Sequence, residues 1–335
     1  MLKSKTVFIL GAGASQEFGF PVGTGLANSI RLRMNVQDDS LGNLTGSGDV
    51  QLVNAVGAAE KSTTLAISAA ADRLRRGLPL RNSIDDFLDV HREDELVIKL
   101  GKAAIVKTIL EYENQCKLTP SRSSGSPAVD FSNLTDIWLA KLVKMMGPTG
   151  PEELANNSTF ISFNYDRTLE FFLAQAFQNL FNYKPAEADN TVDRISIIHP
   201  YGVVGDTGAA TLRQRFGLVP QDRNCLSNAP LVHTYTEEMS DSRTQAQIHQ
   251  AIKDAQRLVF LGFGFHAQNI RLLTPIENIG PRQVFATAHQ INPEEHEILK
   301  TRISQIFHGQ SGGIELFDGR CADFFDAFHF RLSEI

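Results

Sequence analysis

The sequence predicts an α/β protein with a Rossmann-like, doubly wound parallel sheet and a helical insertion subdomain. Short apolar segments alternate with longer amphipathic ones along much of the chain, which is the order of strands and helices in such folds. The short segments are apolar at almost every position, as expected for strands that are buried on both faces. The first of them, residues 6–10, leads directly into a turn that contains Gly11 and Gly13.

Six strands are expected, at residues 6–10, 159–163, 194–198, 258–261, 283–286 and 314–317. The helices expected between them cover residues 166–181, 244–256, 293–307 and 322–332. Residues 25–154 differ, because their apolar residues recur at helical spacing and Ser83 with Asp86 forms a capping box. We therefore expect residues 1–24 and 155–335 to form the Rossmann-like domain, and residues 25–154 a mostly helical insertion.

Three connections are expected to lie outside regular structure. Residues 118–130 contain four serines, two prolines and a glycine, a composition typical of a surface loop, and residues 38–49 are similar in kind. Residues 201–242 form a long connection just after an expected strand. A long loop at that end of a sheet can act as a lid over a binding site.

Composition limits the class of protein. The chain has 335 residues, of which 42% are hydrophobic and 21% charged, the values of an ordinary globular protein. A net charge of −6 argues against a surface built for nucleic acid. We find no apolar run long enough to span a membrane and no secretory segment, and the three cysteines are scattered. A cytoplasmic location is therefore expected.

The turn after the first strand predicts a site for a phosphate-bearing ligand. Gly11 and Gly13 let the backbone approach a ligand closely, Ala12 lies between them, and the amides of the helix that follows can receive negative charge. Ser15 can bond a phosphate or cap its helix. The dehydrogenase fingerprint is incomplete, because Gln16 stands where a third glycine belongs, and a Walker loop is absent. A tight strand-to-helix turn without a ligand is the alternative.

Four segments resemble parts of the sirtuin family in the order of that family. Gly-Ala-Gly-Ala-Ser at residues 11–15, followed by Gly-Phe-Pro at residues 19–21, resembles its nucleotide-binding loop. Residues 160–166, Phe-Ile-Ser-Phe-Asn-Tyr-Asp, are similar to its strand ending in Asn-x-Asp. Residues 258–265 occupy the place of its later Gly-Thr-Ser segment, and residues 319–323 are similar to the turn that closes over the adenine.

Two departures separate this chain from the sirtuin deacylases. Their zinc ribbon needs two C-x-x-C pairs, whereas Cys116, Cys225 and Cys321 are far apart. The helical insertion is the second departure. Both features resemble the bacterial sirtuin-like NADases of anti-phage defence. The resemblance implies metal-free hydrolysis of NAD⁺ to nicotinamide and ADP-ribose by a toxic effector. It also implies control by homo-oligomeric assembly or by a partner such as a HerA-like ATPase.

The resemblance assigns catalytic roles to four residues. Asn164 matches the sirtuin asparagine that grips the ribose or a water, and its alternative role is to cap the next helix. Asp166 either touches the ribose or serves that same helix start. The family has His followed at once by Gly, whereas this chain reads His199-Pro200-Tyr201-Gly202. His199 is the first candidate base, since an unperturbed tyrosine is a poor base at pH 7, and Tyr201 above His199 is the alternative.

Further residues are assigned to NAD⁺ binding by the same resemblance. Phe20 and Pro21 are expected to wall the nicotinamide end. The residues expected at the adenosine half are Gly262, Gly264, Phe265, Asn292 and Cys321.

Two other functions compete with NAD⁺ hydrolysis. One is NAD-dependent protein deacylation or ADP-ribosylation, which would need an acyl-lysine channel usually framed by the missing zinc ribbon. The other is a non-catalytic module that senses NAD⁺ or ADP-ribose and signals through its assembly.

Overall fold

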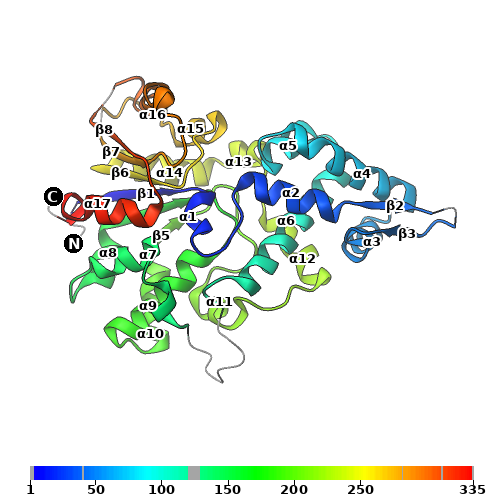
Figure 1. Cartoon of the computed structure of the whole chain (residues 1–335), viewed down its shortest axis with the longest axis horizontal. Coiled ribbons are helices and arrows are strands. Elements are labelled where there is room, and N and C mark those ends of the chain that lie inside the picture. Colours follow the sequence, from blue (N-terminus) through cyan, green and yellow to red (C-terminus); the bar gives the residue numbers. More distant parts are fainter. Residues whose placement is uncertain (1–3, 40, 120–128, 281, 311, 334–335) are drawn as a thin grey trace.

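The computed structural model describes residues 4–39, 41–119, 129–280, 282–310 and 312–333. Its centre is a six-stranded sheet, all parallel, in the order β5-β4-β1-β6-β7-β8 (Figure 1). The strands are β1 (Thr6–Leu10), β4 (Ser158–Ser162), β5 (Ser196–Ile198), β6 (Arg257–Leu261), β7 (Gln283–Thr287) and β8 (Ile314–Phe317). Counted along the chain, this order is 3-2-1-4-5-6, the order of the Rossmann fold. The predicted fold class is confirmed.

The two central strands carry the core of the sheet. Every residue of β1 and of β6 is buried. Phe8 of β1 stacks on Phe160 of β4 with ring centroids 5.0 Å apart. The strand expected at residues 194–198 starts later, at Ser196, because the preceding helix continues through Arg194.

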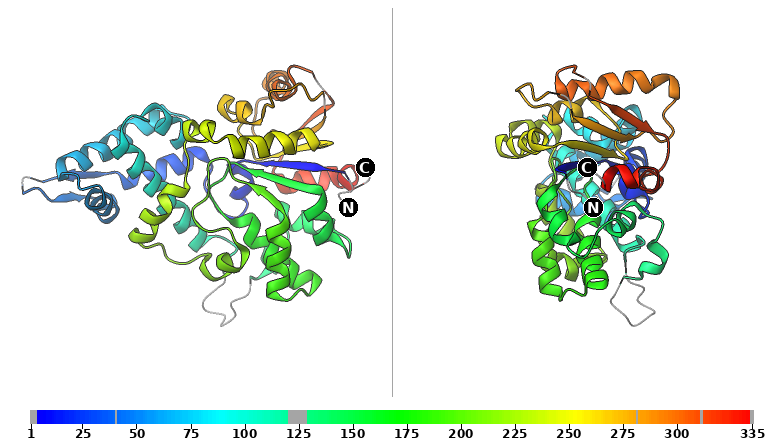
Figure 2. Two further views of the ribbon diagram at one scale, coloured as in Figure 1. Left: turned by 180° about the vertical axis from the view of Figure 1, so that it is seen from behind. Right: turned by 90° about the vertical axis from the view of Figure 1, so that its left-hand side faces the viewer.

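Helices lie on both sides of the sheet (Figure 2). The helices along the C-terminal half are α14 (Ser242–Asp254), α15 (Ala267–Leu273), α16 (His296–Ser304) and α17 (Cys321–Ser333), with the 3₁₀ turns η5 (Pro293–Glu295) and η6 (Gln305–Phe307). Between β4 and β5 lie α9 (Thr168–Phe181) and α10 (Pro185–Arg194). Sequence reasoning missed α10, although Pro185 at its first turn and Glu187, which accepts the amide of Lys184 at 3.3 Å, are start signals.

Most of residues 25–154 form a helical cluster beside the sheet (Figure 1). Its members are α2 (Gly23–Arg33), α3 (Val50–Ala59), α4 (Thr64–Gly77), η1 (Leu78–Leu80), α5 (Ile84–Val90) and α6 (Glu95–Gln115). The rest of this stretch is η3 (Phe131–Leu134), α7 (Trp138–Lys144) and α8 (Gly150–Asn157). Here α7 packs against α17 and α8 against β4, so these two helices belong with the sheet.

The structure differs from the sequence prediction in two of the three connections that were expected to lie outside regular structure. Residues 38–49 overlap a short antiparallel hairpin of β2 (Val36–Asp38) and β3 (Leu44–Gly46). Residues 120–128 of the other expected surface loop lie outside the described residues. The connection at residues 201–242 is largely helical, with α11 (Ala209–Arg215), α12 (Asp222–Asn228), η4 (Ala229–Leu231) and α13 (Tyr235–Ser240). Its role as a lid stays a prediction.

Buried charge ties the helical cluster to the sheet domain. Arg167, just before α9, donates to both carboxylate oxygens of Glu113 on α6, at 2.9 and 2.6 Å. Their side chains are 4% and 1% exposed. Across the described ranges, no helix combines the length and apolar character needed to cross a membrane.

Candidate functional site

The glycine turn after β1 packs directly against the turn after β6. The Gly11 amide donates to the Leu261 carbonyl and the Gly13 amide to the Gly262 carbonyl, both at 3.0 Å. A Cβ at Gly11 would lie 2.5 Å from the Gly262 oxygen, and one at Gly13 would lie 2.7 Å from the Gly262 Cα. Gly262 has φ +57°, a left-handed conformation that favours glycine. These glycines therefore bring two backbones together. Such a contact needs glycine whether or not the turn also binds a ligand.

A cavity of about 500 Å³ opens beside this contact. It lies at the carboxyl ends of the strands, next to the point between β1 and β6 where the strand order reverses, the place where open α/β sheets bind ligands. Of the residues expected at a site, eleven line it: Gly11, Ala12, Gly13, Ser15, Phe20, Pro21, Asn164, Asp166, Tyr201, Gly262 and Gly264. The turn after β1 thus has two neighbours, the β6 turn and the cavity.

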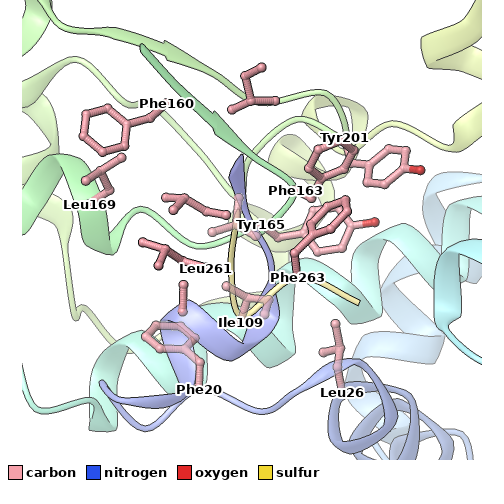
Figure 3. Packing of buried hydrophobic residues seen from close by; sticks show 14 of the residues in the cluster. Phe20, Leu26, Ile109, Phe160, Phe163, Tyr165, Leu169, Tyr201, Leu261 and Phe263 are labelled. Carbon is pink, nitrogen blue, oxygen red and sulfur yellow. The ribbon is translucent and has the colours of Figure 1, made fainter. Parts of the chain in front are cut away.

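The helical insertion supplies the opposite wall of this cavity. Leu26 of α2, Asp85 of α5 and Ile109 of α6 line it together with strand-end residues. Figure 3 shows two of these side chains, Leu26 and Ile109, near Phe163 and Phe263, which follow β4 and β6. The two phenylalanine rings meet edge to face at 5.1 Å. The cavity is therefore formed jointly by the sheet and the helical cluster.

Asn164 holds the end of β4 to the glycine turn. Its Nδ2 donates to the carbonyl oxygen of Gly11 and to Oγ of Ser15, both at 2.9 Å. Its Oδ1 accepts no hydrogen bond from the part of the chain that is described, and Asn164 lines the cavity. The side chain is thus fixed through its nitrogen while its oxygen is available to a ligand. It does not cap α9, which was its alternative role.

Asp166 has the structural role expected at a helix start and also lines the cavity. Its carboxylate accepts the amide of Thr168 at 3.1 Å and the Thr168 hydroxyl. Burial raises the pKa of Asp166 above its ordinary value, against hydrogen bonds from Ser15 and Thr168 that lower it. Ser15 therefore links Asn164 to Asp166.

His199 lies behind Asn164 and outside the cavity wall. Its Nε2 is 2.8 Å from Oε1 of Glu170, and its Nδ1 is 3.4 Å from the carbonyl oxygen of Asn164. The side chains of His199 and Glu170 are 10% and 3% exposed. Burial lowers the pKa of His199, but the charge and hydrogen bond of Glu170 outweigh it and leave the pKa above its ordinary value. Both ring nitrogens are engaged, so the imidazole orients the Asn164 segment.

Tyr201 occupies the cavity wall in the turn that follows β5. Its hydroxyl donates to Oδ1 of Asn269 at 2.6 Å, and its ring meets Phe163 edge to face at 5.7 Å. Tyr201 therefore lines the cavity whereas His199 does not, and the choice of base between them stays a prediction.

Three residues expected at the adenosine half do not line the cavity. Phe265 is buried with φ +52°, and Cys321 is buried at the start of α17, where burial raises the pKa of its thiol. Asn292 is exposed and caps a 3₁₀ turn by accepting the Glu294 amide at 3.1 Å.

Asp85 is the residue at this site that sequence reasoning missed. The hydroxyl of buried Tyr165 donates to Asp85, and both residues line the cavity. Burial raises the pKa of Asp85 to about 6, against the lowering effect of the Tyr165 hydrogen bond. The capping box at Ser83 predicts the helix but gives no sign that it reaches the sheet. His266, also in the wall, has its pKa lowered by burial.

Comparison with protein-family models gives no match, and neither does comparison with curated protein sequences. The strand order and the cavity define the class of protein: an α/β protein of Rossmann topology with a cavity at its topological switch point. Within the described ranges, no group of three or more His, Cys, Asp or Glu side chains is arranged to hold a metal ion.

Proposed function

We propose that this protein hydrolyses NAD⁺ to nicotinamide and ADP-ribose. The observation that carries the proposal is Asn164, which lines a cavity at the switch point. Its amide nitrogen is fixed by the glycine turn, while its oxygen accepts no hydrogen bond from the described residues. The cavity volume of about 500 Å³ is within the range of small-molecule sites. The resemblance of four segments to the sirtuin family supports the choice of NAD⁺ as substrate. The missing zinc ribbon and the helical insertion, which resemble the sirtuin-like NADases, support hydrolysis.

The reaction places modest demands on the protein. The bond between the ribose C1′ and the nicotinamide nitrogen breaks, and its electron pair leaves with nicotinamide, which departs as a neutral molecule. Water then forms a bond to C1′ and loses a proton. The protein has to hold the ribose, position the water and accept that proton.

Three groups of the site are suited to these tasks. Asn164 Oδ1 can accept a hydrogen bond from a ribose hydroxyl or from the attacking water. Asp85 is the proposed proton acceptor, because it lines the cavity and its carboxyl has a pKa of about 6. His199, paired with Glu170, acts as a positioning residue for Asn164. The diphosphate then lies beside the glycine turn, whose Gly11 and Gly13 amides stay bonded to the β6 turn, and the nicotinamide lies beside Phe20 and Pro21.

The cellular role extends the same proposal. A chain that consumes NAD⁺ is toxic to its own cell, so we propose an effector that is held inactive by its assembly state or by a partner such as a HerA-like ATPase. This part rests on the resemblance to the defence NADases alone.

The test is to incubate the purified chain with NAD⁺ and to follow nicotinamide and ADP-ribose by chromatography. Asn164→Ala is expected to reduce nicotinamide release at least 100-fold, about 2.7 kcal/mol in the barrier. Asn179→Ala is the matched control, because Asn179 is an exposed residue of α9. Equal turnover by wild type and Asn164→Ala would contradict the assignment.

Other outcomes select the competing functions. Release of nicotinamide only in the presence of an acylated or acceptor protein would indicate deacylation or ADP-ribosylation. Binding of NAD⁺ without cleavage, with the candidate partner both absent and present, would indicate a sensor.

A further inference from the structure

A second cavity, separate from the first, lies among α6, α11 and α12. Its volume is about 320 Å³, and none of its lining residues lines the first cavity. Arg167, Arg215 and Arg223 contribute to its wall, together with Leu218 and Val219. Three arginines in the wall of one small cavity give it a basic character that the first cavity, which no arginine or lysine lines, does not have.

Two of these three arginines are uncompensated. Arg167 is neutralised by its buried ion pair with Glu113. Arg215 and Arg223 are exposed, and neither guanidinium forms a hydrogen bond or ion pair with any described residue. Asp206 is the acidic residue of the wall, and its carboxylate accepts the Gly208 amide at 2.8 Å. The cavity therefore has an excess of positive charge and forked donors that suit phosphate oxygens.

The rim of the cavity also has an apolar part. Leu218 and Val219 are 53% and 60% exposed although both are aliphatic. Exposed aliphatic side chains beside two arginines suit a molecule that combines a phosphate with an apolar or aromatic portion. We propose that this cavity binds a phosphate-bearing small molecule of nucleotide size, held by Arg215 and Arg223 and packed against Leu218 and Val219.

The position of the site gives it a direct connection to the first cavity. Arg167 lies in the wall of the second cavity, and Asp166, its neighbour in the chain, lies in the wall of the first. A ligand at Arg215 and Arg223 is thus close to the segment that carries Asn164 and Asp166. The inference does not depend on NAD⁺ hydrolysis, because it concerns binding at other residues.

The test is isothermal titration of the full chain with inorganic pyrophosphate, ADP and adenosine. We expect pyrophosphate and ADP to bind, ADP more tightly, and adenosine not to bind at this site. The double variant Arg215→Ala/Arg223→Ala is expected to lose this binding, with a Kd at least tenfold higher. Binding heat that persists in the double variant comes from ligand bound in the first cavity. The difference in heat between wild type and the double variant therefore measures binding to the second cavity.

The matched control removes two exposed arginines elsewhere, Arg76→Ala/Arg243→Ala, and should leave the titration unchanged. Arg215→Lys/Arg223→Lys keeps the charge but loses the forked donors, so its affinity should lie between the other two. Identical titrations of wild type and Arg215→Ala/Arg223→Ala would overturn the proposal. Equal affinity for pyrophosphate and ADP would overturn the role of Leu218 and Val219.

Discussion

At the scale of single residues, the two ends of the Asn164 side-chain amide differ. Its nitrogen makes two hydrogen bonds of 2.9 Å within the protein, and its oxygen, which the proposed function assigns to the ligand, accepts none from the described residues. The imidazole of His199 reaches the carbonyl of the same residue from behind. An asparagine held at both its side chain and its backbone loses little rotamer freedom when a ligand arrives, which favours precise positioning.

Asp85 gives the site a pH dependence whose direction can be worked out. Its pKa is about 6 in the folded protein and near 3.8 in an ordinary environment, so the folded state binds the proton more tightly. Stability from this group is therefore complete below about pH 4 and is lost as the pH rises through 6. Asp85→Asn should melt at a higher temperature than wild type at pH 7, and the difference should vanish near pH 4.

The proposed catalytic role of Asp85 adds an activity profile. NAD⁺ cleavage by wild type should rise through about pH 6 as the carboxyl loses its proton, and this rise should be absent in Asp85→Asn. Glu93→Gln is the control, because the Glu93 side chain is 94% exposed and its ion pair with Arg92 lies in solvent. An unchanged pH profile in Asp85→Asn would remove the carboxyl from the proton transfer.

At the scale of elements, the turns after β1 and β6 are in close backbone contact. Gly11→Ala should destabilise the protein by about 2 kcal/mol or more, because its Cβ would meet the Gly262 carbonyl at 2.5 Å. Gly23→Ala at the start of α2 meets nothing within 4 Å and should be neutral or stabilising by up to about 1 kcal/mol. Denaturant unfolding measures the free energy of unfolding of both variants. An equal change in Gly11→Ala and Gly23→Ala would show that the two turns can move apart to make room for the Cβ.

The ion pair between Arg167 and Glu113 joins α6 to the start of α9. Glu113→Gln should cost about 3–5 kcal/mol, because it leaves a buried guanidinium without its counter-charge. Glu152→Gln breaks the exposed pair with Arg194 and should cost at most about 1 kcal/mol. Denaturant unfolding again provides the comparison. A cost at Glu113 no larger than at Glu152 would mean that water reaches the buried pair.

At the scale of the whole molecule, the sheet could be predicted because its strands are short, apolar and separated by helices. All six expected strands are present, and residues 293–307 form a continuous succession of η5, α16 and η6, as predicted. The hairpin of β2 and β3 could not be foreseen, since its polar, glycine-containing segment reads as a loop. The fold class was fixed by local pattern, whereas the packing of α7 and α8 against the sheet depended on contacts distant in sequence.

The site was predictable only where a motif marks the end of a strand. Gly11, Asn164 and Gly262 follow β1, β4 and β6, so their convergence follows from parallel topology. Asp85 is 80 residues from Tyr165 in sequence, and no local pattern indicates that their side chains meet.

Because sheet and insertion share the first cavity, a ligand there should stabilise both. ADP-ribose at about 100 times its Kd should add about 2.7 kcal/mol to the free energy of unfolding. Hydrogen exchange should slow in α2 and α5 as well as in the glycine turn. Protection confined to the glycine turn would place the ligand away from Asp85 and Leu26.

Substitutions in the wall of the first cavity should have two different kinds of effect. The glycines after β1 and β6 are committed to a contact between backbones, so substitutions there disturb folding itself. The residues that α2, α5 and α6 present to the same cavity are free of that contact. Substitutions in the insertion can therefore reshape the cavity while this backbone contact stays intact.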